Sequence, residues 1–112
     1  MLSIYRWRIS SYLNCLKDYY TDDRLSSTIA FLIASARGDN LEFFAPDDEG
    51  VVYTDRLENI KGVCDEYVSL LGNYSGKTIK STGRKLWYYY ANKAVEFTSE
   101  ERQILLELGI KI

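Results

Sequence analysis

The chain contains no histidine among its 112 residues. This absence excludes Ser-His-Asp triads, Cys-His dyads, histidine acid–base catalysis and every histidine-containing zinc or iron site. Cysteine is scarce as well, because only Cys15 and Cys64 occur, without the Cys-x-x-Cys spacing of zinc sites and thioredoxin-like motifs. Both lie at apolar positions of expected helices, so we expect buried free thiols without a catalytic role, in a reducing compartment.

Long apolar runs are also missing. The longest covers six residues, Ile29 to Ala34, whereas a membrane-spanning helix needs about 20. The start of the chain carries Arg6, Trp7 and Arg8 and shows neither the apolar region nor the cleavage site of a signal peptide. These features predict a cytoplasmic protein that does not bind membranes.

What the sequence does contain is typical of a globular domain, with 46% hydrophobic and 27% charged residues and ten tyrosines. The length is sufficient for one hydrophobic core but not for two. No repeat or low-complexity tract interrupts the chain, and only one proline occurs. We therefore expect a single domain over residues 1–112.

The charges are distributed unevenly along the chain. Residues 39–66 contain two basic and nine acidic residues, whereas residues 73–93 contain five basic residues and no acidic one. The overall formal charge of −2 conceals this separation. Two interpretations follow: the basic segment attracts a charged partner, or the two segments neutralise each other across the fold.

Two helices are expected from apolar spacing alone. Apolar residues recur at spacings of three and four over residues 2–20 and again over residues 55–71, as they do along one face of a helix. The stripe of the second segment is the more regular of the two. Its members are Leu57, Ile60, Cys64, Tyr67 and Leu71.

Two further helices are expected from capping residues. Thr21 can cap a helix that has two aspartates in its first turn and ends at Gly38, although residues 27–34 could instead form a buried strand. Thr98 and Glu101 have the spacing of a capping box, which predicts the start of the last helix.

Two β-hairpins are expected between these helices. The first pairs residues 41–45 with residues 51–54 across an acidic loop. The second pairs residues 77–82 with residues 85–90 around a Gly-Arg turn, with glycine at the position that a type II′ turn requires. The order of helices and hairpins predicts an α+β fold with about four helices and a small antiparallel sheet.

In the second hairpin, the pleat of the strands would gather cations and aromatic rings on the outward face. Aromatic and arginine side chains are typical anchors of protein interfaces. We therefore expect a non-enzymatic interaction protein that docks a partner protein, comparable in class to toxin immunity proteins and phage-encoded inhibitors. The candidate partner-binding residues are Lys80, Arg84, Lys85, Trp87 and Tyr89.

The same residues also fit a nucleic-acid-binding module. Interleaved cations and aromatic rings can follow a phosphate backbone and stack on bases, and an arginine at a hairpin tip can enter a minor groove. The stretch from Gly83 to Tyr89 resembles the wing hairpin of winged-helix transcription regulators. That resemblance implies a wing that contacts nucleic acid.

No pattern of residues predicts an enzyme, a cofactor or a metal site. Residues 76–78 resemble the end of a phosphate-binding P-loop, but three residues separate its two glycines where the motif needs four. A group of acidic residues lacks the spacing of an EF-hand loop and is typical of a solvated turn. Its members are Asp47, Asp48, Glu49 and Asp55.

Overall fold

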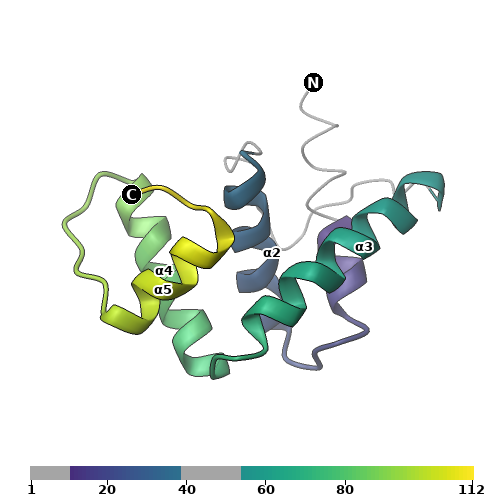
Figure 1. Ribbon diagram of the computed structural model, residues 1–112, viewed down its shortest axis with the longest axis horizontal. Helices are drawn as coiled ribbons and strands as arrows, with labels where there is room; N and C mark the ends of the chain where they lie inside the picture. Colours follow the sequence, from purple (N-terminus) through teal and green to yellow (C-terminus); the bar gives the residue numbers. More distant parts are fainter. Residues whose placement is uncertain (1–10, 39–53) are drawn as a thin grey trace.

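The computed structural model describes residues 11–38 and 54–112, and within these ranges every regular element is a helix (Figure 1). Residues 11–16 form a helical segment. The labelled helices that follow are α2 (Asp23–Arg37), α3 (Thr54–Leu71), α4 (Gly76–Tyr90) and α5 (Ser99–Leu108). The expected α+β fold with an antiparallel sheet is therefore wrong, because the described chain is mostly helical and contains no strand.

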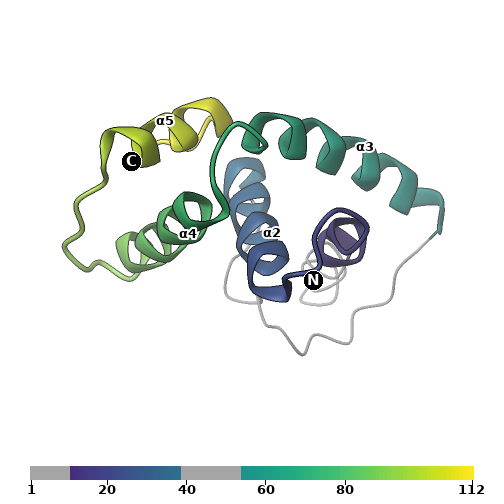
Figure 2. The same cartoon turned by 90° about the horizontal axis from the view of Figure 1, so that it is seen from below.

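Helix α2 runs through the middle of the molecule, with α4 on one side and the helical segment 11–16 on the other (Figure 2). All six residues from Ile29 to Ala34 are buried. A helical stretch that is apolar all round belongs in a core. The alternative of a buried strand over residues 27–34 is wrong.

The ends of α2 explain why this β-branched segment is helical. The Asp22 carboxylate accepts hydrogen bonds from the backbone N–H groups of Arg24 and Leu25, at 2.9 and 3.3 Å. The N-cap is thus Asp22 rather than the expected Thr21. Gly38 ends the helix in the left-handed conformation, with φ of 75°, as the sequence predicted.

Other helix predictions are confirmed within the described ranges. The helix expected over residues 2–20 is helical at 11–16 and turns at 17–19. Helix α3 matches the expectation for residues 55–71 and buries Cys64 and Leu71. The side chains of Leu57 and Ile60 lie outside the described part of the chain.

The last helix, α5, also begins as predicted. Thr98 Oγ1 accepts a hydrogen bond from the Glu101 N–H, and the Glu101 carboxylate accepts one from the Thr98 N–H. This is the expected capping box. Gly109 ends the helix in the left-handed conformation.

The second expected hairpin, over residues 77–90, is wrong, because these residues form α4. Ser75 caps the helix by accepting a hydrogen bond from the Thr78 N–H at 3.2 Å. The side chains of Ile79 and Leu86 are buried at helical spacing. Packing of this stripe against α2 overrides the strand preference of the threonines and aromatic residues. The first expected hairpin, over residues 41–54, lies almost wholly outside the described residues.

The buried apolar side chains form a single core cluster to which residues 11–16 and all four labelled helices contribute. In the described residues, no helix is both long and apolar enough to cross a membrane.

Candidate interaction surface on helix α4

Helices α2 and α4 approach each other closely and run in the same direction. Gly76 lies near Leu25, and further along both helices Gly83 lies against Thr28. A Cβ atom on Gly83 would lie 2.4 Å from Thr28 Cγ2, so no larger residue fits there without a shift of the neighbour. Gly83, which was expected to form a hairpin turn, instead permits this helix contact.

A groove follows the contact between the two helices and has a volume of about 320 Å³. It is open to solvent on one side. Helix α2 contributes three lining residues and α4 contributes four. The lining residues are Ser27, Thr28, Phe31, Lys80, Gly83, Arg84 and Trp87.

Phe31 and Trp87 provide the aromatic part of this groove. Their rings meet edge to face, with centroids 5.5 Å apart. Phe31 is only 4% exposed, whereas Trp87 is 47% exposed. Trp87 therefore belongs partly to the helix contact and partly to the surface.

Two of the side chains that line the groove, Lys80 and Arg84, are cations. Lys80 forms an ion pair with Asp22 of the α2 cap. The hydrogen bond from Lys80 lowers the pKa of Asp22, and the backbone N–H groups of the cap act in the same direction. Arg84 is exposed and forms no ion pair with any described residue. The groove thus retains the full charge of Arg84.

Beyond the groove, α4 ends in a run of exposed aromatic residues. Trp87, Tyr88, Tyr89 and Tyr90 are each between 40% and 47% exposed. The Lys93 ammonium lies 5.3 Å from the centroid of the Tyr88 ring. Four exposed aromatic residues in succession surround the end of the helix, and aromatic exposure of this extent is typical of an interaction surface.

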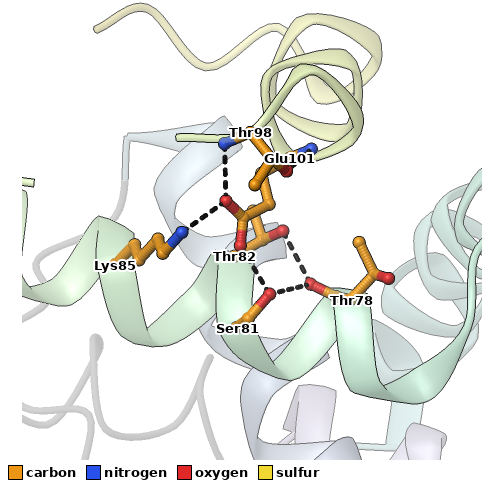
Figure 3. A network of polar contacts seen from close by, with 6 residues as sticks. All are labelled: Thr78, Ser81, Thr82, Lys85, Thr98 and Glu101. Carbon is orange, nitrogen blue, oxygen red and sulfur yellow. Dashed lines mark hydrogen bonds and ion pairs between the residues drawn. The ribbon is translucent and has the colours of Figure 1, made fainter. Parts of the chain in front are cut away.

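A polar network on another face of α4 joins it to α5 (Figure 3). The Glu101 carboxylate accepts hydrogen bonds from Lys85 at 2.7 Å and from Ser81 at 2.5 Å, besides that from the Thr98 N–H. Burial alone would raise the pKa of Glu101, but these three donors lower it to about 2. The carboxylate is therefore ionised at neutral pH, and its charge is matched inside the protein.

The structure thus divides the five candidate partner-binding residues into two groups. Lys80, Arg84 and Trp87 line the groove together. Lys85 points to Glu101, and Tyr89 contacts Phe97 with ring centroids 6.5 Å apart. The hairpin arrangement, which placed Lys80, Lys85, Trp87 and Tyr89 on one face, is wrong because α4 turns by about 100° per residue.

Sequence reasoning missed the contribution of α2 to this surface. Ser27, Thr28 and Phe31 lie on one face of a helix at spacings of one, three and four. This spacing could be recognised in the sequence, but a hairpin over residues 77–90 would not place a parallel helix beside α2. The groove exists only because residues 23–37 and residues 76–90 are both helical.

Both cysteines are buried free thiols, as expected, at 3% exposure for Cys15 and 0% for Cys64. Burial raises the pKa of Cys15, and it raises the pKa of Cys64 to about 12. Thiols held so firmly in the protonated form are poor nucleophiles.

The helical structure of residues 76–90 also changes the interpretation of two sequence motifs. The resemblance to a wing hairpin falls, because the stretch from Gly83 to Tyr89 is helical. Residues 76–78 form the first turn of α4 rather than the start of a strand. Among the described residues, no cluster of three or more acidic or cysteine side chains could hold a metal ion. Asp47, Asp48 and Glu49 lie outside these residues.

No protein-family model, curated protein or solved structure matches this chain.

Proposed function

We propose that this protein is a non-enzymatic interaction protein that docks a partner protein through the exposed aromatic end of α4. The observation that carries this proposal is the run from Trp87 to Tyr90, four aromatic side chains at 40% to 47% exposure on one helix. Tryptophan, tyrosine and arginine are enriched among the residues that dominate the binding energy of protein interfaces. Tryptophan and tyrosine bury large areas at little cost in conformational entropy. Arg84 lies one helical turn before this run.

The distribution of charge favours a protein over a nucleic acid as the partner. Lys80 and Lys85 are already paired with Asp22 and Glu101. A nucleic-acid interface relies on several cations that exchange counterions for phosphates. Pairing within the protein removes two of the three cations that suggested such an interface.

We further propose a reducing, cytoplasmic compartment. Cys15 and Cys64 are both free and buried on neighbouring helical segments. Small proteins of oxidising compartments commonly use cysteine pairs as disulfides. Two unpaired thiols in one core support a compartment that keeps thiols reduced.

The test is capture of partners from the native lysate with the tagged full chain, with and without nuclease. Trp87→Ala removes the most exposed of these four aromatic side chains. Leu106→Ala is the matched control, because Leu106 is an apolar side chain of α5 that is 71% exposed. We expect a captured protein to be lost with Trp87→Ala, kept with Leu106→Ala, and unaffected by nuclease.

Two outcomes would contradict the proposal. Release of the partner by nuclease would favour the alternative hypothesis of a nucleic-acid-binding module. Full capture by a folded Trp87→Ala variant, verified by its thermal unfolding, would remove the α4 surface from consideration.

A further inference from the structure

The groove between α2 and α4 has the size of a site for one large side chain. Its volume of about 320 Å³ lies at the small end of the range of about 300 to 1,000 Å³ that is typical of ligand pockets. The buried ring of Phe31 and the half-exposed ring of Trp87 meet edge to face within it. An inserted apolar group would therefore gain contact with the aromatic lining and displace water mainly from the half-exposed ring of Trp87.

The two cations that line the groove, Lys80 and Arg84, favour a ligand that carries hydrogen-bond acceptors and negative charge. None of the seven lining residues is acidic. The nearby carboxylate of Asp22 is occupied by Lys80 and by the two backbone N–H groups of the α2 cap. Arg84 forms no ion pair in the described part of the chain, and its guanidinium can bind a carboxylate through two parallel hydrogen bonds.

We propose that this groove binds an acidic segment of a partner protein, which inserts one large apolar side chain against Phe31 and Trp87 and places a carboxylate on Arg84. The inference rests on the proposed function and adds the chemistry of the partner. A single-stranded nucleic acid fits less well, because the groove offers one uncompensated cation and a strand needs a line of them.

The test begins with a selection of random displayed peptides on the folded full chain. We expect the enriched peptides to share one large apolar residue with aspartate or glutamate beside it. A synthetic peptide of the enriched sequence, labelled with a fluorophore, then serves as the probe in anisotropy titrations. These titrations measure its dissociation constant for each variant of the protein.

Three variants make the titrations specific to the groove. Ser27→Leu fills the groove from α2 without changing α4 or any charge, and we expect it to weaken peptide binding by about tenfold or more. Arg84→Met removes the cation but keeps much of the side-chain volume, and we expect binding to weaken by about threefold to tenfold. Lys77→Met is the matched control, because Lys77 is an exposed cation of α4 that does not line the groove.

Several results would overturn the inference. These are the failure of any peptide to enrich, enrichment without acidic residues, or binding that Ser27→Leu leaves unchanged. Equal losses with Arg84→Met and Lys77→Met would indicate unspecific attraction by charge and would also overturn it. If Ser27→Leu fails to fold, the comparison of Arg84→Met with Lys77→Met decides alone.

The two proposals fail in distinguishable ways. If partner capture depends on Trp87 but substitutions in the groove do not change peptide binding, only the inference of an acidic segment is wrong. If capture from the lysate does not depend on Trp87, the proposed function itself is wrong.

Discussion

Glu101 shows how a single residue can serve two elements at once. Its backbone N–H and its carboxylate complete the capping box at the start of α5, and the same carboxylate binds Lys85 and Ser81 of α4 (Figure 3). The side chain is 3% exposed, so an unpaired charge there would be costly. Lys85 therefore contributes to stability, although its sequence context suggested a role in binding.

The first prediction concerns the pH dependence of stability. The pKa of Glu101 is about 2 in the folded protein, against an ordinary value of 4.5. Its stabilisation is therefore complete above about pH 4.5 and is lost as the pH falls towards about 2. The size of this contribution is at most about 3 kcal/mol. Denaturant unfolding at a series of pH values measures it.

Glu101→Gln isolates this contribution. We expect the variant to be less stable than the wild type by about 2 kcal/mol at neutral pH, because it leaves Lys85 without its partner. The difference between the two proteins should shrink as the pH falls through the acidic range. A difference that stays constant would show that the Glu101 charge does not stabilise the fold.

The second prediction concerns Ser26, whose hydroxyl is buried and has no hydrogen-bond partner among the described residues. Such a group costs about 1 to 3 kcal/mol, and alanine is also the better helix former. We expect Ser26→Ala to raise the free energy of unfolding by about 1 kcal/mol. Ser35→Ala is the control, because the Ser35 hydroxyl donates to Phe31 O at 2.9 Å. Equal effects of the two substitutions would contradict this explanation.

At the scale of elements, the contact between α2 and α4 organises the fold. Both helices carry residues of high strand propensity, and the caps at Asp22 and Ser75 set where each begins. Gly83 lowers the intrinsic stability of α4 by about 1 kcal/mol relative to alanine. The close approach to Thr28 compensates for this cost, because it brings the two buried stripes together.

The third prediction tests that approach. Gly83→Ala is expected to destabilise the protein by about 1 to 2 kcal/mol despite the better helix propensity of alanine, because its Cβ meets the Thr28 methyl group. Thr28→Ser removes this methyl group and keeps a hydroxyl for the hydrogen bond to Arg24 O. The double variant should recover most of the loss in thermal or denaturant unfolding. Stabilisation by Gly83→Ala alone would contradict the close contact.

The sequence predicts correctly those helices whose capping residues or apolar spacing lie within the helix itself. The capping box at Thr98, the stripe that includes Cys64 and Leu71, and the glycine end of α2 all predicted helices that the structure confirms. Helix α4 was mistaken for a hairpin because its glycine supports either interpretation. Only the partner surface on α2, which is remote in sequence, decides between a turn at Gly83 and a helix contact there.

At the scale of the whole molecule, the candidate site could be predicted only in part. The sequence singles out cations and aromatic residues between residues 80 and 89, but their grouping in space depends on which of them meet α2 and α5. Lys80 and Lys85 are neutralised by acids 58 and 16 residues away in the sequence. Charge counts along the chain do not reveal such pairing. Among the described residues that line the groove, it leaves Arg84 as the cation without an ion pair.

The central claim is that the exposed aromatic end of α4 contacts a partner protein, and site-specific photo-crosslinking in the native lysate tests it most directly. A benzophenone amino acid in place of Tyr88 keeps Trp87 and Arg84 intact, and the same group in place of Leu106 on α5 serves as the control. We expect irradiation to produce a protease-sensitive, nuclease-resistant adduct from position 88 and none from position 106. Adducts from position 106 alone, or a nuclease-sensitive adduct from position 88, would contradict the claim.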